Sequence, residues 1–165
     1  MNLVGPGDVG MHYRDAELAL GWLEPTGLWA DLGSGAGFPG IVLSALFPRI
    51  TVHLVESRRK RCTFLEHVLL AAGTPRDQAE VRCMRVEDLP GQAYDGIVAR
   101  AFAPPPAVLD HARRLLVPGG IVVLFLQEGP PLGETPGFEA FHVEHYAVEG
   151  KSRRAVALRM LHSAC

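Results

Sequence analysis

The chain has 165 residues, 48% of them hydrophobic and 21% charged, and its formal net charge is −2. A chain of this length buries one core and leaves no room for a second substrate domain, so residues 1–165 are expected to form a single domain. The near-neutral charge excludes a global electrostatic attraction to nucleic acid. Any RNA binding therefore has to come from local basic clusters.

Neither a membrane segment nor a metal site is indicated. No apolar stretch approaches the roughly 18 residues of a membrane span, and no basic-then-apolar leader opens the chain. Cys62, Cys83 and Cys165 are odd in number and lack C-x-x-C spacing, which predicts no disulfide framework and no zinc site. His142 and His145 have no companion cysteine or acidic cluster. These features predict a cytoplasmic protein without a metal.

Hydrophobic periodicity predicts strands and helices that alternate through most of the chain. After a first helix near 11–23, strands are expected near 28–33, 51–56, 79–84, 94–99, 121–127, 138–146 and 153–160, and helices near 38–47, 58–73 and 104–116. This order predicts an α/β fold with a mostly parallel seven-stranded sheet that ends in an antiparallel hairpin. Pro118-Gly119-Gly120 predicts a turn before the fifth strand, and the Gly/Pro-rich stretch 128–137 is expected to hold no full crossover helix.

The segment that ends the first strand, Asp31-Leu-Gly-Ser-Gly-Ala-Gly-Phe-Pro-Gly40, has the glycine density of a ligand-binding turn in a Rossmann-like sheet. Gly35-x-Gly37-x-x-Gly40 matches the dinucleotide pattern, in which a pyrophosphate sits on a helix N-terminus. Gly33-x-Gly35-x-Gly37 behind Asp31 instead matches a loop for S-adenosylmethionine (SAM), and a purely structural turn is a third interpretation. SAM is a sulfonium cation without phosphate. The Asp31 carboxylate therefore favours SAM over a pyrophosphate, which it would repel.

Two later turns carry candidate ligands for an adenosine. Glu56 ends the strand near 51–56, at the spacing of about 20 residues at which an acid reaches ribose hydroxyls in this fold. A solvated carboxylate at a strand end is the alternative. Val86 and Glu87 follow the strand near 79–84, where backbone groups or an acid can bind an adenine edge and Val86 can pack on its face. Glu87 equally suits a helix start, where the helix dipole favours acids.

Several motifs, taken together, are typical of one protein family. They are the loop ending in Phe38-Pro39-Gly40, then Leu54-Val-Glu-Ser57, Arg85-Val-Glu87 and Val98-Ala-Arg-Ala-Phe102. This combination resembles the bacterial 16S rRNA guanine-N7 methyltransferases, also called glucose-inhibited division protein B. The opening Asn2-Leu3, with His12 and Asp15, is similar to the segment that leads into that family's first strand. The resemblance implies a Rossmann-like, SAM-dependent enzyme that acts on 16S rRNA of the small ribosomal subunit, and we expect a monomer.

The resemblance also implies which residues form the site. Arg100, at the end of the strand near 94–99, and Arg153 are the expected catalytic residues. Guanine N7 has a free lone pair, so no base is needed, and an arginine bound through both O6 and N7 would block the nucleophile. Arg100 is therefore expected to hold O6, a phosphate or the surroundings of SAM. The expected SAM-binding residues are Asp31, Gly33, Ser34, Gly35, Gly37, Phe38, Glu56, Ser57, Val86, Glu87 and Arg100.

Two departures from the family pattern keep other functions open. Members carry a lysine-glycine after the fifth strand, where this chain has Gln127-Glu128-Gly129, and they have a longer helical segment ahead of Asn2. A shortened chain or a more open substrate cleft would explain the second departure. The alternatives are a methyltransferase for a small molecule or a protein, a non-catalytic SAM- or nucleotide-binding module, and a NAD-dependent oxidoreductase.

Overall fold

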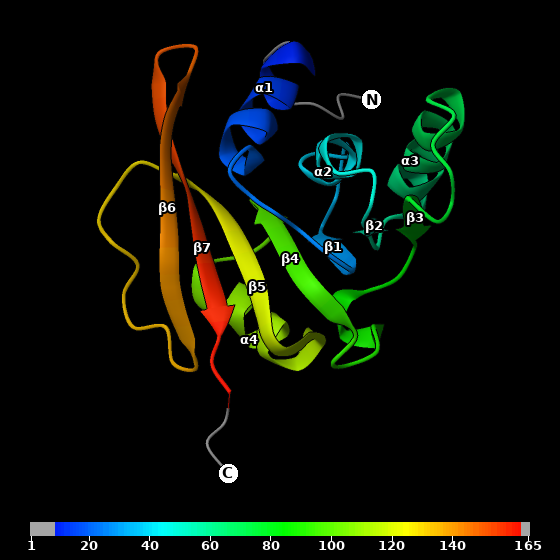
Figure 1. The fold of residues 1–165 in the computed structure, drawn as a ribbon. Helices are drawn as coiled ribbons and strands as arrows, with labels where there is room; N and C mark the ends of the chain where they lie inside the picture. Colours follow the sequence, from blue (N-terminus) through cyan, green and yellow to red (C-terminus); the bar gives the residue numbers. More distant parts are fainter. Residues whose placement is uncertain (1–8, 163–165) are drawn as a thin grey trace.

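Seven strands form one sheet in the order β3-β2-β1-β4-β5-β7-β6 (Figure 1). The computed structural model describes residues 9–162, so the expected similarity at Asn2-Leu3 lies outside the described residues. The strands are β1 (Leu28–Leu32), β2 (Thr51–Val55), β3 (Ala79–Arg82), β4 (Tyr94–Arg100), β5 (Leu116–Gln127), β6 (Phe138–Val148) and β7 (Lys151–Met160).

The first five strands run parallel, and β7 runs antiparallel to both of its neighbours, β5 and β6. This confirms the predicted α/β fold with a mostly parallel sheet and an antiparallel C-terminal hairpin. β1 pairs with β2 on one side and with β4 on the other, so the strand order reverses between β1 and β4. Open α/β sheets bind ligands outside the carboxyl ends of the strands at such a switch point. Here that point lies between Gly33 and Arg100.

Helices cover both faces of the sheet (Figure 1). They are α1 (Val9–Leu20), α2 (Gly40–Leu46), α3 (Arg59–Ala71) and α4 (Pro105–Leu115), with a short 3₁₀ turn η1 (Val86–Asp88). The apolar sides of α1, α2 and α3 share one core with Trp29 and Leu54 of the sheet. The apolar side of α4 forms the second core with Ile97 and Val122. None of the helices in the described part of the chain is long and apolar enough to cross a membrane.

The fifth strand begins earlier than the sequence predicted. The turn expected at Pro118-Gly119-Gly120 lies inside β5, which starts at Leu116. Leu116 pairs with Tyr94 and Ile121 pairs with Gly96, so β5 carries extra residues opposite β4 at this point. The proline and glycines at 118–120 therefore form a bulge inside β5, and not a turn ahead of it. The stretch 128–137 contains no helix, as predicted.

Cys62 and Cys83 form a disulfide, although the number and spacing of the cysteines predicted no disulfide framework. Cys62 lies on α3 and Cys83 directly follows β3, against which α3 packs. The two Cα atoms are 5.7 Å apart, a usual separation for a disulfide. The 21-residue spacing gives no signal in the sequence, because only the return of the chain after α3 brings the two residues together. Among residues 9–162 there is no group of three side chains that could hold a metal ion.

This disulfide closes a short loop and should stabilise the fold by restricting the unfolded chain. For a loop of this length the chain-entropy estimate is about 3 kcal/mol. We expect the oxidised protein to exceed the reduced protein in free energy of unfolding by about that amount, measured in urea with and without dithiothreitol. Cys83→Ser should unfold like the reduced protein and be insensitive to reductant. An oxidised and a reduced protein of equal stability would contradict this prediction.

Candidate functional site

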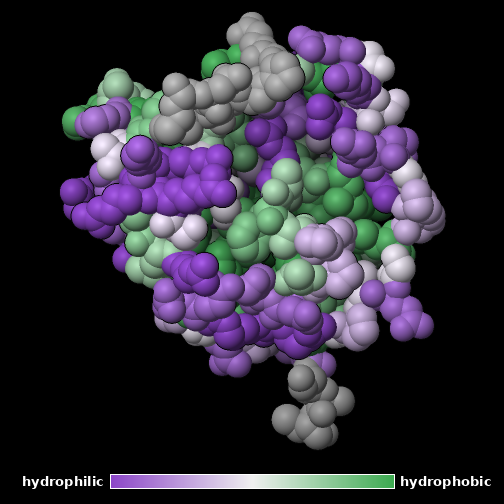
Figure 2. Space-filling view, turned by 180° about the vertical axis from the view of Figure 1, so that it is seen from behind, coloured by the Kyte–Doolittle hydropathy of each residue, from purple (hydrophilic) through white to green (hydrophobic). Residues whose placement is uncertain are grey.

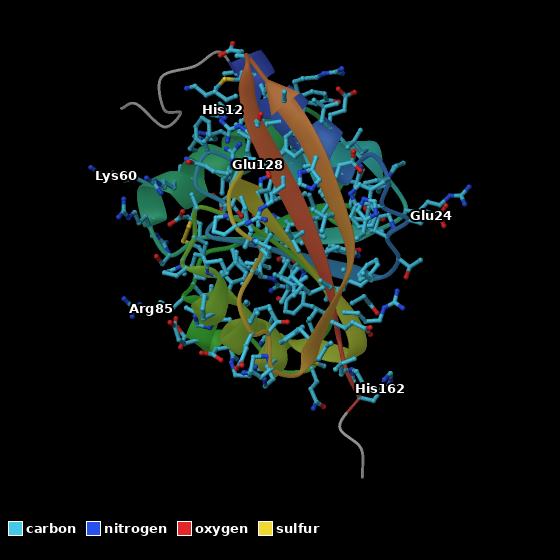
Figure 3. All side chains as sticks on the ribbon, turned by 90° about the vertical axis from the view of Figure 1, so that its left-hand side faces the viewer. His12, Glu24, Lys60, Arg85, Glu128 and His162 are labelled. Carbon is cyan, nitrogen blue, oxygen red and sulfur yellow. A yellow bond between two sulfur atoms is a disulfide. The ribbon has the colours of Figure 1, made fainter. Side chains whose placement is uncertain are left out.

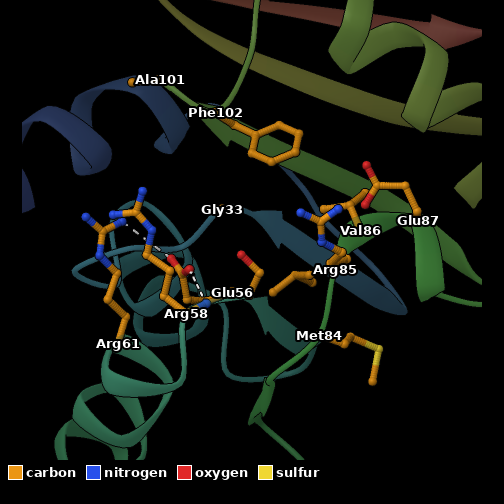
Figure 4. A pocket seen from close by; sticks show the side chains of 12 residues that line it. Gly33, Glu56, Arg58, Arg61, Met84, Arg85, Val86, Glu87, Ala101 and Phe102 are labelled. Atoms are coloured by element: carbon orange, nitrogen blue, oxygen red, sulfur yellow. Dashed lines mark hydrogen bonds and ion pairs between the residues drawn. The ribbon is translucent and has the colours of Figure 1, made fainter.

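A cavity of about 370 Å³ opens beside the switch point of the sheet (Figure 4). The residues that directly follow β1, β2 and β4 line it, together with η1 and the segment before η1. It brings together five of the predicted SAM-binding residues, which come from separate segments of the sequence: Gly33, Glu56, Ser57, Val86 and Glu87.

The remaining lining residues include several that the sequence prediction did not assign to the cofactor. Arg58 and Arg61 stand beside Glu56, and Met84 and Arg85 stand beside Val86 on the other wall (Figure 4). Arg85 belongs to the Arg85-Val-Glu87 motif itself. The other three adjoin that motif or the one that contains Glu56, so nearness to a motif was their only signal in the sequence. Phe102 covers the glycine loop so closely that a Cβ on Gly33 would lie 2.6 Å from its ring.

Glu56 directly follows β2 and fastens the glycine loop to the start of α3. Its side chain is buried; Oε2 accepts a hydrogen bond from the Gly35 N–H at 3.1 Å, and Oε1 accepts one from the Arg58 N–H at 2.8 Å. Nη1 of Arg61 lies 3.6 Å from Oε2. A carboxylate has about four acceptor positions, so Glu56 keeps capacity for ligand hydroxyls. The carboxylate is thus held in a fixed place in the cavity wall.

Asp31 does not line the cavity but lies beneath the glycine loop. It is 1% exposed, and its Oδ2 accepts a hydrogen bond from the Gly40 N–H at 3.0 Å, at the first residue of α2. The Ser34 hydroxyl donates to the Asp31 carbonyl oxygen at 3.0 Å. Burial raises the pKa of Asp31 to about 6, although the contacts with Ser34 and Gly40 act against it. The carboxylate therefore occupies the N–H group of Gly40 that a pyrophosphate would need.

Gly35 and Gly37 serve different purposes in the loop. Both adopt a positive φ, of 58° and 97°. A Cβ on Gly37 would overlap the Ile41 side chain, so this glycine allows the loop to pack on α2. A Cβ on Gly35 would come no closer than 3.6 Å to the protein, at the Gly33 carbonyl oxygen. Arg61 Nη1 would lie only slightly farther away, at 3.7 Å, so the positive φ of Gly35, and not a lack of room for a Cβ, is what favours glycine there.

Arg114, on α4, supports the wall of the cavity that Val86 and Glu87 form. Its Nη2 donates to the Val86 carbonyl oxygen and its Nη1 to the Leu89 carbonyl oxygen, both at 2.6 Å. The two carbonyls lie at either end of the turn formed by η1. Charge-assisted hydrogen bonds of this kind are strong, so Arg114 fixes Val86 and Glu87 relative to the sheet. In the sequence, Arg113-Arg114 is only a basic pair within the helix expected near 104–116, and nothing in it points to these carbonyls.

Arg100 and Arg153 lie together next to the glycine loop, around a residue whose role the sequence did not reveal. Nη1 of Arg100 is 3.0 Å from Oδ2 of Asp15, and Nε of Arg153 is 3.5 Å from Oδ1. Asp15 comes from α1 and is 2% exposed. Nδ1 of His12 is 3.3 Å from Nη1 of Arg100, whose guanidinium lies 5.7 Å from the Phe38 ring centre. The two expected arginines thus meet at Asp15, with Phe38 beside Arg100, and none of these residues is among those that line the cavity.

A single backbone turn separates the cavity from this arginine cluster. Ala101 adopts a φ of 53°, which is uncommon for a residue with a side chain. The turn lets Arg100 reach Asp15 while Phe102, two residues on, covers Gly33. The Arg100-Ala101-Phe102 motif therefore serves both parts of the site.

The surface around the site is polar and partly basic. Lys60 and Arg85 project from the same side of the molecule, and His12 and Glu128 lie toward one end of it (Figure 3). Glu128 pairs with His145 at 3.1 Å. From behind, hydrophilic residues surround a hollow with hydrophobic residues in its floor (Figure 2).

The fold defined by this sheet and its switch-point cavity is that of Rossmann-like methyltransferases. A SAM-dependent methyltransferase from Aquifex aeolicus superposes with a TM-score of 0.69 over 93% of this chain and 94% of its own, at 18% identity. TYW2 of Pyrococcus horikoshii, solved in complex with MeSAdo, gives 0.69 over 97% of this chain and 65% of its own, at 19% identity.

Sequence comparison identifies the family. The model of the rRNA small subunit methyltransferase G family matches residues 11–130, so the chain belongs to that family. The ribosomal RNA small subunit methyltransferase G of Zymomonas mobilis is 52% identical over 90 residues, which make up 54% of this chain and 37% of the relative. The Caulobacter vibrioides protein is 40% identical over 134 residues, or 77% of this chain and 60% of the relative. The chain thus spans less than two thirds of the length of these two relatives.

Asp31→Asn removes the charge of the side chain and keeps its hydrogen bond with the Gly40 N–H, so it shows the effect of the charge alone. Asparagine keeps an oxygen for the Gly40 N–H but has no charge to bury. The wild-type carboxyl has a raised pKa, so its contribution to stability is largest below 3.8 and is lost as the pH rises toward about 6. One pKa unit corresponds to about 1.4 kcal/mol. We expect Asp31→Asn to lack this pH dependence and to be about 1–3 kcal/mol more stable than wild type at pH 7.5.

Urea unfolding at pH 4.5, 6 and 7.5 measures this difference. A variant with the same pH dependence as wild type would show that Asp31 is not the titrating group.

Arg114→Ala should weaken SAM binding, although Arg114 is not among the residues that line the cavity. Loss of the two charge-assisted hydrogen bonds should free Val86 and Glu87 and cost roughly 2 kcal/mol in stability. We expect the Kd for SAM to rise about tenfold, since part of the binding free energy would then be spent on ordering the turn. Arg113→Ala is the matched control, because Arg113 bonds to Asp110 and to the Pro136 carbonyl on the surface. Equal SAM affinity in both variants would contradict this role for Arg114.

Proposed function

We propose that the protein is a SAM-dependent methyltransferase that methylates N7 of a guanine in 16S rRNA of the small ribosomal subunit. Membership of the rRNA small subunit methyltransferase G family carries this proposal. A cavity with an anchored carboxylate, close to a pair of arginines at the same end of the sheet, supports it.

The residues of the cavity suit SAM better than a dinucleotide. In our proposal Glu56 accepts the ribose hydroxyls, and Val86 and Met84 offer apolar surface to the adenine. At the start of α2, the Asp31 carboxylate already accepts from Gly40 and would repel a pyrophosphate. This contact argues against the NAD-dependent alternative. The negative charge of Asp31 favours a cationic ligand above its pKa of about 6.

The chemistry asks the protein mainly to hold its substrates in place. When bound, SAM supplies an electrophilic methyl group on its sulfonium. Guanine N7 needs no deprotonation, so correct alignment and the exclusion of water can provide the catalysis. In our proposal, Arg100 and Arg153 hold the guanine O6 or a neighbouring phosphate and leave N7 free. The Phe38 ring beside Arg100 offers a surface for a base that has left its stack.

The remaining properties follow from the proposed substrate. The small ribosomal subunit is the partner, and the cytoplasm is the compartment in which the protein meets it. We propose that the chain acts there as a monomer, with its 165 residues forming one domain. In a reducing cytoplasm Cys62 and Cys83 would be thiols for most of the time.

Methylation of 16S rRNA and of 30S subunits from a bacterial strain lacking its own enzyme tests the proposal. We expect transfer of labelled methyl from SAM and the appearance of 7-methylguanosine in one rRNA fragment, detected by mass spectrometry. SAM binding without any methylation would favour a non-catalytic module. Methylation of a small molecule or protein but not of rRNA would favour a different substrate.

Arg100→Ala separates substrate positioning from cofactor binding in the same assay. We expect its affinity for SAM to stay within a few fold of wild type and its turnover to fall about 10²-fold, as misplacing a reactant typically does. Arg100→Lys should restore only part of the activity, because an ammonium lacks the planar fork of donors. A variant that melts earlier but turns over normally would show that Arg100 serves only the fold.

A further inference from the structure

Asp15 is a buried carboxylate whose partners come from distant parts of the chain. It lies on α1, and the two arginines that face it come from β4 and β7. Its side chain is 3% exposed, whereas those of Arg100 and Arg153 are 21% and 28% exposed. The acid is therefore shielded from water while both guanidinium groups reach the surface.

The hydrogen-bonding geometry leaves much of each guanidinium available. Arg100 uses Nη1 for Asp15 and His12, whereas Nε of Arg153 is paired with Asp15 by charge at 3.5 Å without a hydrogen bond. Within residues 9–162, no hydrogen bond engages Nη2 of Arg100 or either Nη atom of Arg153. Asp15 thus holds one side of each guanidinium and leaves the other donors for a further partner.

The electrostatics of the cluster favour an anionic partner. Two permanently charged arginines share the one buried carboxylate of Asp15, which neutralises only one of the two charges. Burial raises the pKa of the nearby Asp31 carboxyl, and the charge of Arg100 acts against that rise. Burial and the Arg100 charge lower the pKa of His12, so its imidazole is neutral at pH 7 and can accept from Arg100. Burial, and then the Asp15 carboxylate, raise the pKa of Tyr146, so its hydroxyl stays protonated. Neither His12 nor Tyr146 therefore adds a negative charge beside the two arginines.

A purely structural role explains this arrangement poorly. α1 already attaches to the core through Ala16, Ala19 and Leu20, none of which has any exposed surface. Burying a carboxylate costs free energy that its ion pairs only partly return, so such clusters are weak sources of stability. A helix that needed only to be anchored would gain more from an apolar residue at position 15.

We propose that Asp15 is a positioning residue that fixes the guanidinium groups of Arg100 and Arg153 so that their free N–H donors face a phosphate or carbonyl oxygen of the substrate. This inference rests on the proposed function, since the substrate is the rRNA named there. Asp15 itself would not touch the substrate. Its effect passes through the two arginines, one on each side of the β5 strand end.

Asp15→Asn tests the proposal, because it keeps the shape of the side chain and removes its charge. We expect the SAM affinity to stay within about threefold of wild type and single-turnover methylation of rRNA to fall about 10²-fold. The losses of turnover in Asp15→Asn and Arg153→Ala should not add in the double variant. Once Asp15→Asn has freed Arg153, removing the Arg153 side chain should have little further effect. Glu17→Gln is the matched control: Glu17 is on the same helix and pairs with exposed Arg14 at 2.7 Å. It should behave like wild type.

A measurement on the unliganded protein keeps the inference distinct from the proposed function. In ¹⁵N NMR of arginine side chains, we expect the Nε–H signals of Arg100 and Arg153 to move to exposed, averaged positions in Asp15→Asn but not in Glu17→Gln. Unchanged signals in Asp15→Asn, or normal turnover despite loosened arginines, would overturn the positioning role. If wild type binds SAM but methylates no rRNA, the proposed function fails, and the NMR comparison still decides whether Asp15 holds the arginines.

Discussion

Two buried carboxylates fix the glycine loop through hydrogen bonds to its backbone N–H groups, and the rest of the site depends on these contacts. Asp31 accepts from Gly40 at the start of α2, and Glu56 accepts from Gly35 in the middle of the loop. A glycine-rich segment loses much conformational entropy when it is ordered, so it needs such fixed partners. The carboxylates thus hold the loop beside the switch point, and Glu56 also lines the cavity there.

The cavity and the arginine cluster lie on either side of this loop. Phe38 connects the loop to Arg100, while Phe102 covers Gly33 on the cavity side. The left-handed turn at Ala101 allows both contacts from neighbouring residues. Cofactor and substrate groups would therefore be positioned by one continuous piece of backbone, so that a change in the loop affects both.

The sequence predicted what depends on local pattern and missed what depends on distant contacts. Strand and helix periodicity indicated the sheet, and spacing from the loop indicated Glu56 as a cavity residue. Asp15 meets Arg100 across 85 residues, and no local pattern encodes that pairing. Arg114 is hidden for the same reason, because its partners are backbone carbonyls that any residues could supply. The disulfide and the bulge in β5 likewise arise only once the strands are paired.

Calorimetric titration with SAM, S-adenosylhomocysteine and NAD shows whether the switch-point cavity is a SAM site. We expect SAM and S-adenosylhomocysteine to bind with a stoichiometry of one, and NAD to give no heat of binding. Glu56→Ala should weaken SAM binding by roughly 1.5–3 kcal/mol for each charge-assisted hydrogen bond that the substitution removes. Binding of NAD in preference to SAM, or SAM affinity unchanged in a folded Glu56→Ala protein, would show that SAM does not bind at this cavity.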